Sequence, residues 1–245
     1  EQFIYAITIV YFIRMIIMKI YAYRLYMPNF KSFSIPKNMS EILSFSFYII
    51  LAGSAGSILL EIDKFMIPQM EKIAQVAYYS VGVYIASVIA IPSRAMQQIT
   101  NPITAKDLNN NNLNEVELLY KKSSINLLII GGLLFLLINI NIQELYAIIN
   151  KPEYSVGVLI VLMISISELF KLSLGTNGAI LINSKYYKML FYFSIAMAVS
   201  VIIFNRFFIE LLGIDGAALA TLLVVIIFNV IKVIYVKNKL NIHPY

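Results

Sequence analysis

Three charged side chains inside apolar stretches are the residues of this sequence best suited to chemistry. Arg14 lies near the middle of the first stretch, and Glu168 and Lys171 lie one helical turn apart in the fifth. Charges within a membrane are costly, so they usually face a cavity or a charged partner. Arginine presents a planar fork of donors that suits phosphate, and a titrating glutamate can couple a process to protons. The plainer alternative is that Glu168 and Lys171 form a structural ion pair and that Arg14 pairs elsewhere in the bundle.

Four further polar residues lie near the ends or breaks of apolar stretches. Asp63 and Lys64 follow the second stretch, where they are either ion-coupling or gate residues or an ordinary ion pair at the membrane interface. Arg94 follows the third stretch, where it can meet a lipid phosphate or anchor the helix among anionic lipid heads. Asn177 belongs to the Gly-Thr-Asn-Gly run at 175–178, which interrupts the fifth stretch. Transporters use such breaks near their sites, although packing through small residues explains the run equally well.

Several classes of site are not expected in this sequence. Cysteine is absent, which excludes disulfides and thiolate sites. The single histidine, His243, lies beyond the last apolar stretch, so a histidine metal site or a catalytic triad is not expected. There is no Gly-x-x-x-x-Gly-Lys run for ATP. The loops also lack the acidic cluster that a membrane glycosyltransferase needs. We therefore predict a protein that is not an enzyme and that holds no metal or cofactor.

Apolar stretches position these candidates. Hydrophobic residues make up 60% of the sequence and charged residues 13%, with a mean hydropathy of +0.81; soluble domains carry about 25% charged residues. Because the apolar runs are continuous rather than alternating, they predict helices and not strands. We therefore predict an all-α integral membrane protein. Its seven spans, each near the roughly 20 residues that cross a bilayer, are expected at Phe3–Tyr23, Ile42–Leu60, Ile73–Pro92, Ile125–Ile142, Tyr154–Leu181, Met189–Phe204 and Ile214–Val236.

The basic residues alternate between the two sides of this arrangement. A net charge of +6 suggests nucleic acid in a soluble protein, but here the charge lies in short loops, and we predict no nucleic-acid partner. One set of loops holds eleven basic residues: Arg24, Lys31, Lys37, Arg94, Lys106, Lys121, Lys122, Lys185, Lys188, Lys237 and Lys239. The opposite set holds four: Lys64, Lys72, Lys151 and Arg206. The positive-inside rule makes the richer side cytoplasmic, with the N-terminus outside and the C-terminus inside. Residues 101–122 are predicted to form a polar surface loop there, with a polar helical run through Glu115, Glu117, Lys121 and Lys122.

Several short motifs resemble, in order and spacing, those of a known transporter group. They are Glu61-Ile-Asp63-Lys64-Phe-Met-Ile, Val76-Ala-Tyr-Tyr79-Ser-Val-Gly82-Val-Tyr84, Ile91-Pro-Ser-Arg94, Asn101-Pro102-Ile-Thr-Ala105, the turn Asn-Lys-Pro-Glu-Tyr154, and Gly213-Ile-Asp-Gly216-Ala-Ala-Leu-Ala-Thr221. The chain resembles, over essentially its whole length, oligosaccharide flippases of the multidrug/oligosaccharidyl-lipid/polysaccharide (MOP) exporter superfamily. Each motif alone is weak, and their shared order carries the resemblance.

The resemblance implies two lobes of about six helices around a central cavity. Residues 1–23 are then the last helix of the N-terminal lobe, 24–41 a cytoplasmic linker between lobes, 42–236 the C-terminal lobe and 237–245 a cytoplasmic tail. The chain begins outside the membrane without a leader, so we expect further helices before it and read it as a piece of a longer transporter. The missing N-terminal lobe and membrane lipids are its expected partners.

The resemblance also implies a function and assigns roles to the charged residues. The family flips polyprenyl-diphosphate-linked oligosaccharides across the bacterial cytoplasmic (inner) membrane for surface polysaccharide synthesis, by alternating access. The substrate-binding cavity would then be lined by Arg14, Arg94, Lys171 and Asn177, with Asp63, Lys64 and Glu168 as ion-coupling or gate residues. The alternatives are an ion-coupled multidrug exporter of the same superfamily or, with less support, a heptahelical receptor or photoreceptor.

Overall fold

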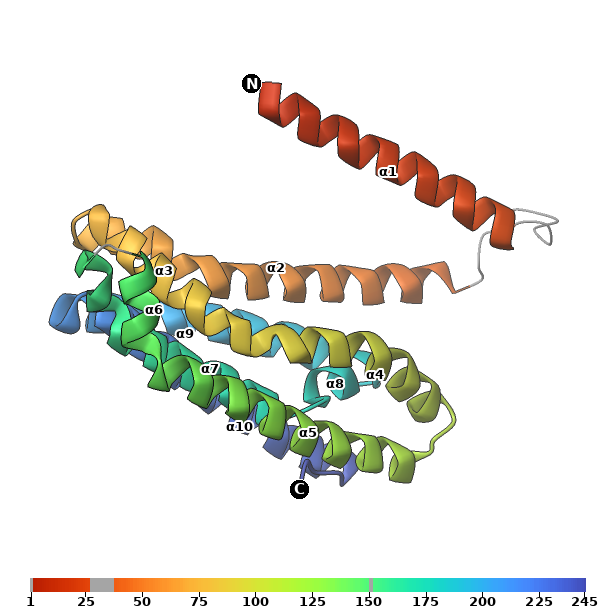
Figure 1. Cartoon of the computed structure of the whole chain (residues 1–245). Coiled ribbons are helices and arrows are strands. Elements are labelled where there is room, and N and C mark those ends of the chain that lie inside the picture. The colour runs from red at the N-terminus through yellow and green to blue at the C-terminus, as the bar shows by residue number, and fades with distance from the viewer. Residues whose placement is uncertain (1, 27–37, 150–151) are drawn as a thin grey trace. The chain divides into compact units, whose positions relative to one another are not determined.

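A computed structural model describes residues 2–26, 38–149 and 152–245 (Figure 1). The chain divides into two compact units, Glu1–Leu43 and Ser44–Tyr245. The first contains α1 (Gln2–Tyr26) and the opening turn of α2 (Met39–Met70). Most of the predicted linker, residues 27–37, lies outside the described residues. Arg14 lies on α1 in the first unit, whereas Arg94 and Lys171 lie in the second. That the three residues share one site therefore stays a prediction.

The second unit is a bundle of helices. After α2, the chain forms a nearly continuous rod of α3 (Ala74–Ser87), the 3-10 turn η2 (Val88–Ala90) and α4 (Ile91–Asn109). The next elements are α5 (Leu113–Ile140), α6 (Ile142–Ile149), η3 (Pro152–Gly157) and α7 (Val158–Ser173). The last are α8 (Asn177–Asn183), α9 (Tyr187–Leu212) and α10 (Ile214–Leu240). Among the described residues there is no strand, which confirms the predicted all-α class.

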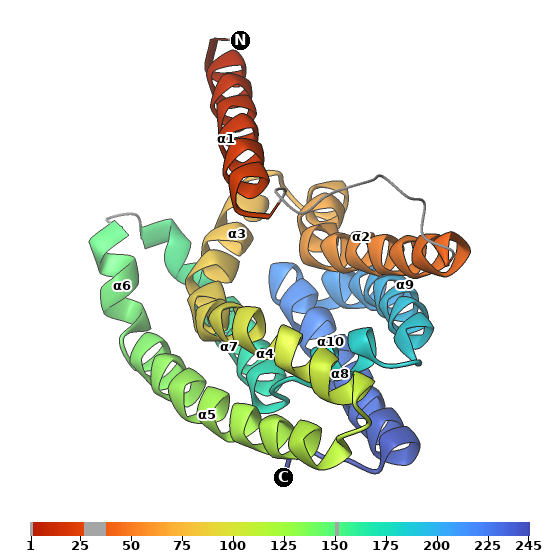
Figure 2. The same cartoon turned by 90° about the vertical axis from the view of Figure 1, so that its right-hand side faces the viewer.

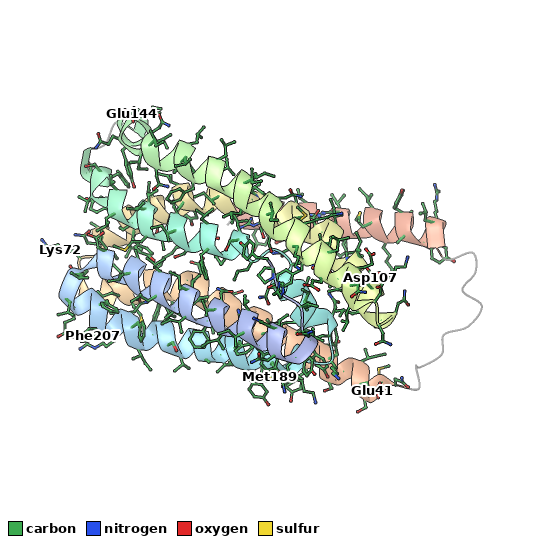
Figure 3. The ribbon with its side chains drawn as sticks, turned by 90° about the horizontal axis from the view of Figure 1, so that it is seen from below. Glu41, Lys72, Asp107, Glu144, Met189 and Phe207 are labelled. Carbon is green, nitrogen blue, oxygen red and sulfur yellow. The ribbon has the colours of Figure 1, made fainter. Side chains whose placement is uncertain are left out.

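Among the described residues, seven segments are long and apolar enough to cross a membrane, in agreement with the predicted number. Within the second unit, α7 packs against α3, α5 and α10, and α9 packs along α10 (Figures 1 and 2). Lys72, Glu144 and Phe207 lie at one end of the bundle, and Asp107 and Met189 lie at the other (Figure 3). The helices therefore run alternately up and down, as the alternating charge of the loops predicts.

Several predicted span ends differ from the helices of the structure. In residues 101–122, α4 continues to Asn109 and α5 begins at Leu113, so the predicted loop is wrong, whereas the helical run predicted from Glu115 is confirmed. The interval is a tight turn in which Asn111 has a φ of 55°. These polar helix ends pack on neighbouring helices, and Tyr120 is fully buried there. The prediction missed them because hydropathy identifies only the part of a helix that lies in lipid. Likewise α10 continues to Leu240, past the predicted end at Val236.

Small residues bring α9 and α10 into close contact. Gly216 is buried, and Ala217, Ala218 and Ala220 have no exposed surface. A Cβ atom added to Gly216 would lie 1.9 Å from the carbonyl oxygen of Phe208. Lipid tails are as apolar as side chains, so helices in a membrane associate through such close packing. The contact fixes α10, which carries part of the site described below.

We expect Gly216→Ala to destabilise the bundle, because its Cβ can be accommodated only if two backbones move apart. Overpacking of this kind costs about 1–3 kcal/mol. The matched control is Gly132→Ala in α5, where an added Cβ meets nothing within 4 Å. Thermal unfolding in detergent measures the difference; equal midpoints for the two variants would contradict the close contact.

Candidate functional site

A cavity of about 380 Å³, lined by both polar and apolar residues, lies among α3, α4, α7, α8 and α10. Three of the predicted substrate-binding residues line it, namely Arg94, Lys171 and Asn177, together with the predicted coupling residue Glu168. Its other polar lining residues are Ser87, Ser93, Gln97 and Asn229. The fold thus brings together predicted site residues that are far apart in sequence, since Arg94 and Asn177 are separated by 83 residues.

Glu168 and Lys171 form the predicted ion pair on α7. The Lys171 Nζ atom lies 2.5 Å from Oε1 of Glu168. The side chain of Glu168 is 14% exposed and that of Lys171 36%, so water screens the pair only in part. This contact confirms the predicted ion pair, which was the alternative to a functional role for the two residues. Because both residues also line the cavity, the pair is at the same time available to a ligand.

Arg94 holds the other positive charge of this cavity. It lies in the first turn of α4, just after η2 and Pro92. Proline favours the first turn of a helix because it has no N–H to leave unpaired. In the part of the chain that the structure describes, no carboxylate lies within salt-bridge distance of Arg94. Its guanidinium is exposed and free to contact an anion.

The interruption between α7 and α8 positions Asn177. Gly175 has a φ of +49°, and α8 begins two residues later. The Thr176 backbone N–H donates to Ser123 Oγ at 3.2 Å, and Asn177 Nδ2 donates to the Tyr120 hydroxyl at 2.8 Å. The break is therefore anchored on α5. Asn177 Oδ1 is buried and has no hydrogen-bond partner in the structure, which leaves it an acceptor without a donor beside the cavity.

We expect Gly175→Ala to disturb this break. Its positive φ strains any residue with a side chain, and the new Cβ would lie 2.5 Å from Ser124 Oγ and 2.7 Å from the Ser124 backbone nitrogen. Gly178→Ala is the control, because nothing lies within 4 Å of its added Cβ. Thermal unfolding should show a loss of about 1–3 kcal/mol for the first variant and little for the second. An unchanged midpoint for Gly175→Ala would show that the break is not rigid.

Asp63 is buried, so one of its two predicted interpretations, an interface ion pair with Lys64, is wrong. Its exposed fraction is 3%. Lys64 bonds instead to Glu61 at 2.9 Å. Consecutive residues on a helix point in different directions, so Asp63 turns into the bundle while Lys64 stays at its surface. A gate role for Lys64 remains a prediction.

Asp63 accepts hydrogen bonds from three other helices. Its Oδ1 accepts from Asn205 Nδ2 on α9 at 2.6 Å, and its Oδ2 accepts from Thr221 Oγ1 on α10 at 2.9 Å. The Tyr79 hydroxyl on α3 also donates to Oδ2. We call Asp63, Tyr79, Asn205 and Thr221 the Asp63 cluster. Sequence reasoning missed the last three residues, because nothing local marks them as neighbours of Asp63.

The Asp63 cluster holds a carboxylate that forms no salt bridge, although the charge of Lys64 acts on it. Among the described residues, no lysine or arginine lies within salt-bridge distance of Asp63. Three donors favour its ionised form, yet burying an unpaired charge is costly. Asn205 Oδ1 is buried beside it without a hydrogen-bond partner. Carboxylate, amide and hydroxyl oxygens in one buried place suit a proton or a small hard cation.

A smaller cavity of about 50 Å³ is lined by residues of both groups. Asp63, Tyr79 and Thr221 line it, and so do Glu168 and Lys171. The same ion pair also lines the larger cavity. The Glu168–Lys171 pair therefore borders both cavities.

Lys232 is a further cation near the site, which the sequence analysis does not single out. It lies on α10, three residues after Asn229 of the larger cavity, and its Nζ is 3.4 Å from Met197 Sδ. Lys171 is close enough to repel it. No described carboxylate lies within salt-bridge distance of Lys232. Val225 lines the smaller cavity and Asn229, four residues later on α10, lines the larger one. Lys232 continues this helical spacing, which was the signal that could have placed it near the cavities.

Comparisons with known proteins agree with this architecture. Residues 2–100 match the family described as "Polysaccharide biosynthesis protein". A search of curated proteins finds no match. Among solved structures, an outward-facing multidrug resistance MATE family transporter of the MOP superfamily is similar, with a TM-score of 0.51 and 17% identity. The similarity covers 82% of this chain and 46% of that one, so the chain spans about half the length of the transporter.

The chain has the fold of a MOP-superfamily transporter. Together with the family match to residues 2–100, this confirms the resemblance that the motifs predict. The chain is a multi-pass membrane protein with seven candidate spans.

Proposed function

We propose that this MOP-type chain is part of a flippase that moves polyprenyl-diphosphate-linked oligosaccharide across the bacterial inner membrane for surface polysaccharide synthesis. The observation that carries the proposal is the cavity lined by Arg94, Lys171 and Asn177. Its cations suit the negative diphosphate, with arginine offering a bidentate fork. Its serine, glutamine and asparagine side chains suit sugar hydroxyls. The polyprenyl tail would stay in the bilayer.

Transport would proceed by alternating access with a second lobe that precedes this one. The substrate would enter from the cytoplasmic side, which the positive-inside rule assigns to the basic loops. Rocking of the two lobes about the central site would then expose it to the other side. Arg14, on the helix assigned to the first lobe, is a further candidate for binding the diphosphate.

The driving ion is proposed to act at Asp63, with Glu168 as the second titrating candidate. A buried carboxylate whose hydrogen-bond donors are all neutral keeps one negative charge, which one proton or one monovalent cation can neutralise. Binding of that ion would neutralise the cluster, and its release would restore the charge. A switch between two charge states in the core is what coupling to an ion gradient requires.

A multidrug exporter of the same superfamily is the second candidate function. The similarity to a multidrug resistance transporter supports it. The charges of the cavity favour the polysaccharide substrate. It contains Arg94 and Lys171 against the single carboxylate of Glu168. A site for cationic drugs would be expected to have the opposite balance. The family match to residues 2–100 supports the same choice.

Flipping by the complete transporter tests the proposal. Full-length protein reconstituted into liposomes should move a fluorescent polyprenyl-diphosphate oligosaccharide between leaflets when an ion gradient is applied, and empty liposomes should not. Drug efflux from cells that express the same protein provides the comparison. Efflux of cationic drugs without movement of the lipid-linked sugar would favour the exporter.

A further inference from the structure

The amide side chains that line the larger cavity are each held by an N–H group. Asn177 Nδ2 donates to the Tyr120 hydroxyl at 2.8 Å, and Asn229 Nδ2 donates to the Val225 carbonyl at 2.7 Å. Gln97 Nε2 likewise donates to a serine hydroxyl one helical turn earlier, at 3.0 Å. None of the three carbonyl oxygens accepts a hydrogen bond from a residue that the structure describes. The cavity wall therefore holds three amide acceptors that lack a donor.

The lining of this cavity has two chemically distinct parts. Ser87 Oγ donates its hydrogen to the Tyr84 carbonyl at 2.8 Å, so toward a ligand it is an acceptor as well. The oxygens of a diphosphate are also acceptors and gain nothing from these atoms, whereas guanidinium and ammonium groups bind them. A diphosphate therefore belongs on Arg94 and Lys171. The acceptors require another part of the ligand, one that carries O–H or N–H groups.

The two parts of the lining are adjacent. Arg94 and Gln97 lie three residues apart on α4, and side chains at this spacing share one face of a helix. Asn177 opens α8, which contacts both α4 and α10, and α10 carries Asn229 (Figure 2). In a glycosyl diphosphate, the first sugar is bonded directly to the diphosphate, so the charge and the donors of that ligand are adjacent in the same way.

We infer that Gln97, Asn177 and Asn229 form a sugar subsite, in which their carbonyl oxygens accept hydrogen bonds from hydroxyl or acetamido N–H groups of the sugar nearest the diphosphate. This inference rests on the proposed function and narrows it, because it assigns the charge and the sugar of the substrate to different residues. A buried acceptor without a donor is costly. The sugar subsite therefore discriminates against a ligand that cannot supply a donor.

Tyr120 is the positioning residue of the sugar subsite. Its side chain is fully buried on α5, and its hydroxyl accepts the hydrogen bond from Asn177 Nδ2. This bond holds the amide of Asn177 in one orientation and leaves Oδ1 without a partner. Tyr120→Phe keeps the ring and removes the bond, so the amide can rotate. Sugar recognition should then weaken, while Arg94 and Lys171 still bind the diphosphate.

The test compares the affinity of the full-length protein for two lipids. One is the polyprenyl-diphosphate oligosaccharide extracted from the cells that make the protein, and the other is the same polyprenyl diphosphate without sugar. The natural protein should bind the first about ten-fold more tightly or better, because several hydrogen bonds are added. Asn229→Leu and Tyr120→Phe should each weaken binding of the sugar-bearing lipid by about 3–10-fold and leave binding of the bare lipid unchanged. Binding of the bare lipid also shows that each variant is folded.

Two control variants change the same residue types outside the cavity. Asn139→Leu on α5 removes an amide that, like that of Asn229, donates to the carbonyl four residues earlier, here at 2.9 Å. Tyr146→Phe removes a buried hydroxyl group on α6. Both variants should keep the full preference for the sugar-bearing lipid.

The outcomes separate the sugar subsite from the proposed function. Natural protein that binds neither lipid would overturn both. Equal affinity of the natural protein for the two lipids would overturn the sugar subsite and leave diphosphate recognition standing. The same conclusion would follow if Asn229→Leu and Tyr120→Phe weakened binding of both lipids equally, or if both variants kept the full preference for the sugar-bearing lipid.

Discussion

Asp63→Asn should reduce flipping to the level of empty liposomes while the protein still folds. The amide cannot take up a proton or balance a cation, so the cluster loses its two charge states. Its hydrogen bonds can survive, because the carbonyl oxygen of the new amide still accepts and the hydroxyls of Tyr79 and Thr221 can accept from its NH₂ group. Asn205 can also turn its unpartnered Oδ1 toward the new donor.

Thermal stability distinguishes this loss of coupling from unfolding. A neutral amide costs less to bury than an unpaired carboxylate, so Asp63→Asn should unfold at the same temperature as the natural protein or above it. Asp215→Asn at the start of α10 is the matched control, since it makes the same change outside the Asp63 cluster; it should flip normally. Normal ion-driven flipping by Asp63→Asn would remove Asp63 from the mechanism.

Local patterns account for the parts of this architecture that sequence reasoning predicts. Each span is a continuous apolar run, and its length alone identifies it. The Glu168–Lys171 pair is also local, because residues three apart on a helix face the same way. The break at 175–178 is marked by its glycines, one of which has the positive φ that glycine tolerates.

The Asp63 cluster shows what local patterns cannot supply. The partners of Asp63 lie 16, 142 and 158 residues away, at Tyr79, Asn205 and Thr221. Nothing in the sequence around Asn205 distinguishes it from other polar residues of a membrane helix, and the motif that ends at Thr221 does not indicate that this residue meets Asp63. Position along α2 is also misleading, because the end of an apolar run indicates a membrane surface. The helix continues to Met70, and the bundle there provides polar partners that allow a buried carboxylate.

Arg94→Gln is expected to weaken diphosphate binding by about 10–100-fold, and Lys171→Gln to do so by a similar factor. A hydrogen bond to a charged group contributes about 1.5–3 kcal/mol, which corresponds to that range of affinity. Lys171→Gln also leaves Glu168 beside the ligand without its partner, so the double variant Glu168→Gln/Lys171→Gln should recover part of the loss. Farnesyl diphosphate binding to the full-length protein measures all three variants. Lys121→Gln, on α5 and outside both cavities, controls for net charge. Equal affinity of Arg94→Gln and Lys121→Gln would show that the anion binds elsewhere.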